Sequence, residues 1–155
     1  MKVDTTRFGV LELDESSVIR IPRGLIGFED RTEFVLIQHR ADTNFRWLQS
    51  TEEPSLAFVV VDPSQFYNDY EIEITDADAE RLNLTSEEDA LVLVVVAIGQ
   101  EGKEITANLA APVVINSKEL VGAQVVPQDN RYTVKHLLVE QVEQSSEDTT
   151  TIKAA

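Results

Sequence analysis

The chain has 155 residues, 43% of them apolar, a length that suits one ordinary domain with its own hydrophobic core. It has no cysteine, which excludes disulfides, thiolate zinc sites, iron–sulfur clusters and cysteine nucleophiles. Its 28 acidic and 13 basic residues give a formal net charge of −15. That charge argues against direct binding to nucleic acid or to an anionic membrane, because both need basic side chains to meet phosphate.

The sequence predicts an all-β domain of short antiparallel strands, because short apolar and β-branched segments alternate with Gly, Pro and polar residues at intervals typical of a barrel or sandwich. In chain order, the expected strands are residues 2–6, 9–13, 18–21, 34–38, 45–49, 57–61, 70–74, 90–98, 104–107, 113–116, 121–126 and 132–139. Between the third and fourth, the Gly-rich stretch 22–28 predicts a tight loop that presents Leu25, Ile26 and Phe28 as the lid of a core or as a binding patch. Trp47 is expected in the core.

Only residues 75–89 are expected to contain helix. Thr75 or Asp76 can cap a short segment through Leu82, and Ser86 can cap a further turn ending at Asp89. The run ALVLVVVAI at 90–98 then predicts a strand that is buried on both faces, and its nine residues are too few for a membrane-spanning helix.

The two ends of the chain bear on where the protein is found and where its domain stops. Residues 1–7 lack the apolar segment of a secretory signal, so we expect a cytoplasmic protein. Residues 143–155 have almost no apolar content and are expected to form a disordered acidic tail after a single domain at 1–142.

The acidic excess is concentrated in residues 51–100, where twelve Asp and Glu stand against one base, Arg81, giving a net charge of −11. Such a cluster is either a solvated face that keeps the protein soluble and monomeric, or a negative field that attracts a basic partner and repels nucleic acid from it.

Catalytic and metal-binding motifs are scarce. The chain has no nucleophile elbow, Walker A, zincin or dinucleotide-binding motif. Acids at 76, 78, 80 and 87 match four ligand positions of a calcium loop, but Arg81 stands where that loop needs glycine. We therefore expect neither metal, cofactor nor enzymatic activity. The alternative is a small β-barrel hydrolase or ligand-binding protein that uses a carboxylate pair, such as Asp62 with Asp69, together with His136.

A series of short motifs follows in fixed order from about residue 3 to residue 137: TRFG at 6–9, IPxGLxGFE at 21–29, WLQS at 47–50, PxLAFVVxDP at 54–63, DY at 69–70, TANLxAPVVIN at 106–116 and GxQV at 122–125. This ordered series resembles the FliW family of bacterial flagellar assembly factors. The resemblance implies a compact β-barrel-like, non-enzymatic cytoplasmic protein without a cofactor. It also implies a partner switch, in which the protein binds the RNA-binding translational repressor CsrA, relieves its repression of flagellin synthesis, and binds flagellin itself.

In this light the acidic middle of the chain becomes a candidate surface for a basic RNA-binding protein. Glu71 and Glu73 are expected to point the same way along one strand, because side chains alternate with a period of two. Two asparagines bracket the apolar run at 111–115 and serve either a partner's backbone or a local turn. The candidate partner-binding residues are Asp62, Asp69, Tyr70, Glu71, Glu73, Asn108 and Asn116.

Overall fold

The computed structural model describes residues 1–38, 43–67, 69–98, 105–127, 132 and 136–137. Its strands are β1 (Lys2–Thr5), β2 (Gly9–Glu12), β3 (Ile19–Arg20), β4 (Glu33–Ile37), β5 (Arg46–Ser50), β6 (Ala57–Val61), β7 (Ala90–Ile98), β8 (Ile105–Ala107), β9 (Val113–Asn116), β10 (Gly122–Gln124) and β11 (His136–Leu137). The helical segments are η1 (Glu15–Ser17), η2 (Pro63–Gln65), α1 (Asp76–Arg81) and η3 (Glu87–Asp89).

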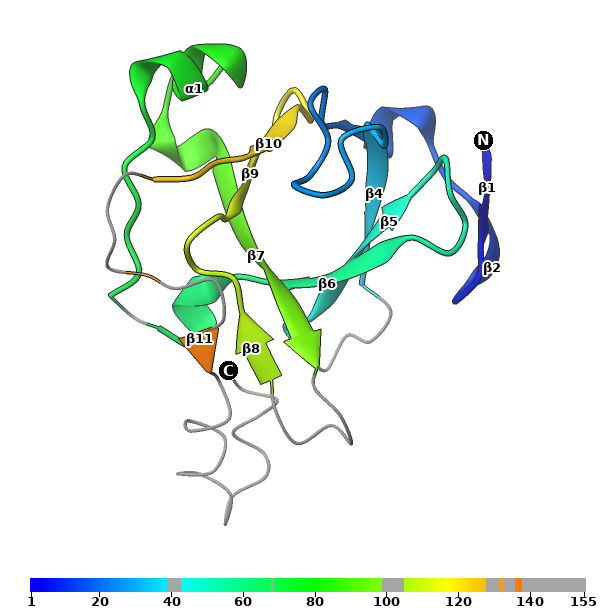
Figure 1. The fold of residues 1–155 in the computed structure, drawn as a ribbon. Coiled ribbons are helices and arrows are strands. Elements are labelled where there is room, and N and C mark those ends of the chain that lie inside the picture. The colour runs from blue at the N-terminus through cyan, green and yellow to red at the C-terminus, as the bar shows by residue number, and fades with distance from the viewer. Residues whose placement is uncertain (39–42, 68, 99–104, 128–131, 133–135, 138–155) are drawn as a thin grey trace.

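Nine of these strands form one antiparallel sheet that curls into a nearly closed barrel (Figure 1). Its main path runs in the order β10-β9-β7-β6-β5-β4-β3, with β8 pairing β7 and β11 pairing β8. A parallel bridge between Arg20 and Val121 joins the two ends of the path, and the Arg20 amide donates to the Leu120 carbonyl at 2.9 Å. Such closure leaves few unpaired strand edges. The β1–β2 hairpin lies outside the barrel (Figure 1), and the mostly β, barrel-like fold expected from the sequence is confirmed.

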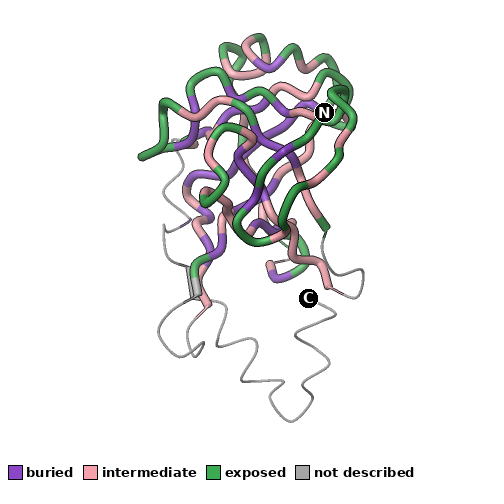
Figure 2. The backbone as a smooth tube through the Cα atoms, turned by 90° about the vertical axis from the view of Figure 1, so that its right-hand side faces the viewer, coloured by how far each residue is buried: buried purple, intermediate pink, exposed green. Residues whose placement is uncertain are grey.

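The long strand β7 connects the parts of the barrel. Its C-terminal half pairs with β6 at Val94–Val96 and with β8 at Val96–Ile98, whereas its N-terminal half pairs with β9 at Ala90–Leu93. Leu93, Val94 and Val96 are buried, as expected for a Val-rich strand covered on both faces. Buried residues run through the centre of the barrel (Figure 2). One apolar cluster of described residues includes Phe34, Leu48, Leu93 and Ile115.

Residues 70–89 lie across the outer face of β7, β9 and β10 rather than in the sheet. The strand expected at 70–74 is wrong: these residues are extended, but they form no ladder with a described strand. Ile72 and Ile74 instead pack with Val92 and Val114 in an apolar cluster on that outer face. The alternation of Glu and Ile looks the same in a sheet strand and in an extended segment laid over a sheet, because both bury every second side chain.

The two helical predictions after this segment are confirmed, but the expectation that helix is confined to residues 75–89 is wrong, because η1 and η2 are short helical turns elsewhere in the chain. The Thr75 hydroxyl caps α1 by accepting from the Asp78 amide at 3.1 Å, and the Ser86 hydroxyl caps η3 by accepting from the Glu88 amide at 3.3 Å. Leu82, one residue after α1, is 1% exposed and joins the outer cluster. The short helix is therefore held by tertiary packing rather than by its length.

Two further expectations, both in the N-terminal half of the chain, have mixed outcomes. In the loop at 22–28, Leu25 is buried in the barrel, whereas Ile26 and Phe28 are exposed. Trp47 is half-buried rather than in the core: its ring packs against Phe8, and the Arg7 guanidinium lies 4.8 Å from the ring centroid.

Among the described residues, no helix has the length and apolar character needed to cross a membrane. The tail expected at 143–155 lies outside the described residues.

Candidate functional site

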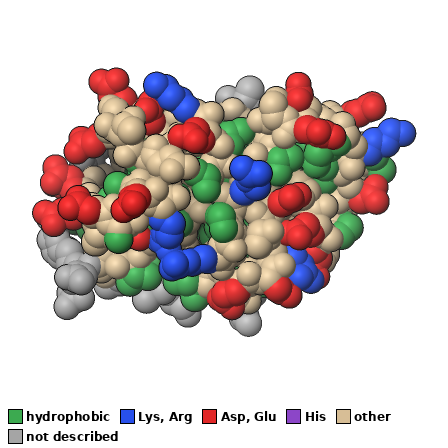
Figure 3. Space-filling model, turned by 90° about the horizontal axis from the view of Figure 1, so that it is seen from above, with side chains coloured by type: hydrophobic (Ala, Val, Ile, Leu, Met, Phe, Trp, Pro, Cys, Tyr) green, Lys and Arg blue, Asp and Glu red, His purple; other side chains and the backbone are tan. Residues whose placement is uncertain are grey.

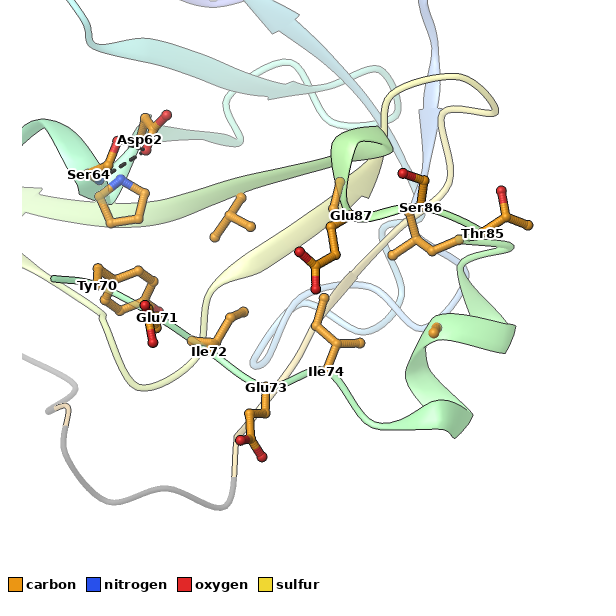
Figure 4. Close-up of a pocket in the computed structure, with 15 residues that line it drawn as sticks. Asp62, Ser64, Tyr70, Glu71, Ile72, Glu73, Ile74, Thr85, Ser86 and Glu87 are labelled. Atoms are coloured by element: carbon orange, nitrogen blue, oxygen red, sulfur yellow. Dashed lines mark hydrogen bonds between the residues drawn. The ribbon is translucent and has the colours of Figure 1, made fainter. Parts of the chain in front are cut away.

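An open groove of about 860 Å³ lies between β7 and the extended segment at 70–74 (Figure 4). One end is formed by the start of η2 and the other by the residues that lead into η3, while α1 contributes to the wall. The lining residues are Asp62, Pro63, Ser64, Tyr70, Glu71, Ile72, Glu73, Ile74, Ala79, Leu84, Thr85, Ser86, Glu87, Ala90 and Val92. Four of the seven predicted site residues, Asp62, Tyr70, Glu71 and Glu73, are therefore brought to one groove.

Two tyrosines fix the start of the extended segment. The Tyr70 hydroxyl donates to the Leu109 carbonyl at 2.7 Å, and its ring packs against the ring of Tyr132 with a 4.5 Å centroid separation. The Tyr132 hydroxyl accepts from the Glu71 amide at 2.9 Å and donates to the Asp69 carbonyl at 3.3 Å. Burial, and to a lesser extent the neighbouring Tyr132, raise the pKa of Tyr70 well above its ordinary value, so the Tyr70 hydroxyl is a neutral hydrogen-bond donor near pH 7.

Side chains along the segment alternate between the two sides. Ile72 and Ile74 are half-buried and point toward β7, whereas Glu71 and Glu73 are exposed (Figure 4). The prediction that the two glutamates share one side is confirmed, although the segment is not a sheet strand. The groove therefore has an apolar floor and a carboxylate rim along one wall.

Carboxylates also stand at both ends of the groove. Asp62 caps η2, since its Oδ1 accepts from the Ser64 amide at 2.9 Å and from the Ser64 hydroxyl at 2.8 Å. At the other end Glu87 extends from η3 toward Ile74 (Figure 4). Asp69 is exposed and lies next to the segment without lining the groove.

The groove opens on an acidic face, which we define as the exposed acids of residues 69–89. In Figure 3, acidic side chains line the end of the molecule that carries α1, and others lie across the rest of this view. The only base in this stretch is Arg81, whose guanidinium forms an ion pair with Asp78, with 2.6 Å between Nη2 and Oδ1. Asp89 forms an ion pair with Lys118 of the turn after β9, with 3.5 Å between Oδ1 and Nζ. The exposed members of the acidic face are Asp69, Glu71, Glu73, Asp76, Glu80, Glu87 and Glu88.

The two predicted asparagines hold the fold locally. Asn116 is 2% exposed, and its Nδ2 donates to the carbonyls of Leu82 and Asn83 at 2.9 and 3.1 Å, while its Oδ1 accepts from the amides of Lys118 and Glu119 at 2.9 and 3.0 Å. The Oδ1 of Asn108 accepts from the Ala111 amide at 3.1 Å. The sequence left two roles open for these asparagines, a contact with a partner's backbone or a local turn. These hydrogen bonds belong to the local role.

The calcium-loop spacing corresponds to a helix in the structure, because Asp76, Asp78 and Glu80 all belong to α1. Within the described part of the chain, no three His, Cys, Asp or Glu side chains gather closely enough to hold a metal ion. His136 lies in β11, but its side chain is outside the described part.

Several groove residues were missed by reasoning from the sequence, namely Glu87 and the apolar residues Ile72, Ile74, Leu84 and Val92. Glu87 stood out only as one of twelve acids and as the last position of the calcium-loop spacing. Ile72, Ile74 and Val92 stood out only as members of predicted strands. Their common position depends on how residues 70–89 fold back over β7. Pro63 is the one local signal, because a proline interrupts strand pairing directly after β6.

Comparison with known proteins gives a consistent result over nearly the whole chain. Residues 2–138 match the family model described as FliW protein. The flagellar assembly factor FliW of Leptospira biflexa is 35% identical over 147 residues, covering 94% of this chain and 96% of that protein. That of Geobacter sulfurreducens is 38% identical over 145 residues, covering 94% and 91%. A crystal structure of the flagellar assembly factor FliW matches with a TM-score of 0.83 and 36% identity, covering 89% of this chain and 96% of that chain. The chain therefore belongs to the FliW family of flagellar assembly factors.

Proposed function

We propose that this flagellar assembly factor is a cytoplasmic, non-catalytic regulator that binds CsrA, relieves its repression of flagellin synthesis, and exchanges CsrA for flagellin. The observation that carries the proposal is the acidic face, with its groove at 62–92. Membership of the family supports the role in flagellar assembly, and the charge of this face supports a basic partner.

The acidic face is suited to a protein that binds RNA. A repressor of messenger RNA must present basic side chains to phosphate, and a face with seven exposed acids accelerates encounter with such a surface. Once docked, the same carboxylates add a negative potential that opposes the approach of phosphate. Binding to CsrA and relief of repression thus follow from one charge distribution.

The proposal is tested by a competition assay with purified components. A labelled flagellin leader RNA is bound to CsrA, and this protein is then titrated in while the RNA-bound fraction is measured. We expect RNA to be released as the protein is added, and rebound when flagellin follows. RNA that stays on CsrA at saturating protein would contradict the proposal, as would release that flagellin does not reverse.

A further inference from the structure

We propose that the groove beside β7 binds an extended segment of a basic protein, which adds as a short strand to the open edge of β7 and lays aliphatic side chains on the groove floor. This inference rests on the proposed function, because it names the surface that a basic partner occupies and the conformation in which it binds.

The first observation is a gap in the barrel wall. β6 pairs with β7 only as far as Val61 opposite Val94, and the chain then leaves through Pro63 into η2. The preceding part of β7, Ala90–Leu93, is paired with β9. This half of β7 therefore has a described neighbour strand on one side only, and the groove lies on the other.

The direction of the backbone groups of β7 supports this assignment. The Asp89 carbonyl accepts from the Ser117 amide at 2.8 Å and the Val95 carbonyl accepts from the Asn108 amide at 2.9 Å, both on the side of β8 and β9. Because backbone groups alternate along a strand, Val92 turns its N–H and C=O to the opposite side, where β6 would have continued. Continuing the register would place Pro63 there, which has no N–H to donate.

On this edge of β7, the backbone of the residues two positions before and after Val92 is already hydrogen-bonded or paired. Val94 is paired with Val61, and the Ala90 amide donates to the Glu87 carbonyl. The open part is thus short, and it is bounded by the groove that the extended segment, α1 and η3 enclose. An unpaired strand edge of this kind is the feature that recognition by strand addition uses.

The side chains of the groove select the chemistry of the occupant. Ile72, Ile74, Leu84 and Val92 are half-buried and give an apolar floor. The ionisable lining residues, within the described part of the chain, are the Tyr70 phenol and four carboxylates, those of Asp62, Glu71, Glu73 and Glu87. An extended segment with aliphatic residues at alternate positions and Lys or Arg between them meets both surfaces at once.

A second copy of this chain is a poorer occupant. Each copy carries a net charge of −15, and the groove opens on the acidic face, so two copies repel each other there. Charge complementarity favours a foreign basic segment.

The inference is tested by fluorescence anisotropy with a labelled eight-residue peptide that alternates Val and Lys. One comparison peptide has Glu in place of Lys, and another has one central Val replaced by Pro, which removes an amide from strand pairing. We expect the Val-Lys peptide to bind at least about tenfold more tightly than either. Equal binding of the proline peptide or the Glu peptide would overturn the inference.

Two residues of one helix supply matched variants. Ala79 lines the groove and Ala77, two residues earlier, is exposed outside it. Ala79→Phe fills the groove and is expected to weaken the Val-Lys peptide at least about tenfold, whereas Ala77→Phe leaves its affinity within about twofold. Glu73→Gln combined with Glu87→Gln keeps the groove shape, and should weaken binding and reduce its salt dependence. Equal affinities for Ala79→Phe and Ala77→Phe, with both variants folded by circular dichroism, would refute the groove as the site.

The same variants separate this inference from the proposed function. If Ala79→Phe binds CsrA with the wild-type affinity, the groove assignment fails and the proposed function stands. If the wild-type protein does not bind CsrA but the Val-Lys peptide responds to Ala79→Phe as expected, the proposed function fails and the groove assignment stands.

Discussion

Asn116 is the residue whose replacement most sharply tests how the groove is held in place. It joins β9 to the end of α1 through two donated hydrogen bonds, to the carbonyls of Leu82 and Asn83, and it accepts two more from the turn after β9. Asn116→Ala removes all four. Each is worth about 1 kcal/mol net, and the buried Leu82 carbonyl is left without its partner, whereas the exposed amides of Lys118 and Glu119 can turn to water.

The expected loss in the free energy of unfolding is therefore about 3 kcal/mol, which corresponds to a decrease in Tm of about 6–12 °C for a domain of this size. Asn108→Ala is the matched control, since it removes one hydrogen bond to the Ala111 amide and should cost about 1 kcal/mol.

Urea unfolding followed by the fluorescence of the single tryptophan measures both values. Native-state hydrogen exchange should also show faster exchange of the α1 amides in Asn116→Ala, because the helix loses its link to β9. If Asn116→Ala were no less stable than Asn108→Ala, the hydrogen bonds would not be what fixes residues 75–89 to the barrel.

Two more predictions concern backbone conformation and tyrosine ionisation. Gly24→Ala should destabilise the protein by more than about 3 kcal/mol, because at φ +65° its Cβ would lie 2.4 Å from the Phe28 carbonyl oxygen. Gly27→Ala, at φ +91° with nothing within 4 Å, should cost about 1 kcal/mol, so similar losses in thermal unfolding would contradict this reading. Tyr70→Phe loses the hydrogen bond to Leu109 and should cost about 1 kcal/mol near pH 7. Folding raises the pKa of Tyr70, so above about pH 10, where the tyrosine of the unfolded chain ionises, the free energy of unfolding of the wild-type protein decreases. Tyr70→Phe has no hydroxyl to ionise at this position, so its free energy of unfolding should lack this contribution to the decrease. If the difference in urea midpoint between the wild-type protein and Tyr70→Phe stays constant from pH 8 to pH 11, the claim that folding raises the pKa of Tyr70 is contradicted.

Strand positions could be predicted from the sequence because period-two burial and the intervening Gly and Pro residues are local features. The same holds for α1 and η3, whose starts are set by Thr75 and Ser86 side chains that accept from nearby amides. Residues 70–74 could not be assigned in this way. Whether an alternating segment joins a sheet or lies over it depends on which backbone comes next to it, and that is decided by residues far away in sequence, such as Leu109 and Tyr132.

The site was only partly predictable for a similar reason. Charge counting found the acidic stretch and placed Glu71 and Glu73 on one side of it. It could not find the groove, whose floor is made by the contact of Ile72 and Ile74 with β7 and whose open edge exists because β6 ends before Pro63. Asparagine side chains serve partners and turns equally well, so the internal role of Asn116 depended on the position of α1.

The central claim, that the acidic face is the surface that meets a basic partner, is tested most directly by the affinity for CsrA of two charge-reversal variants. Glu71→Lys with Glu73→Lys changes the acidic face, whereas Asp4→Lys with Glu12→Lys makes the same charge change on exposed residues of the β1–β2 hairpin at the other side of the molecule (Figure 1). At low ionic strength the first variant should bind at least about tenfold more weakly than the second, with the difference shrinking as salt is added. Equal affinities of the two variants at every ionic strength would contradict the claim.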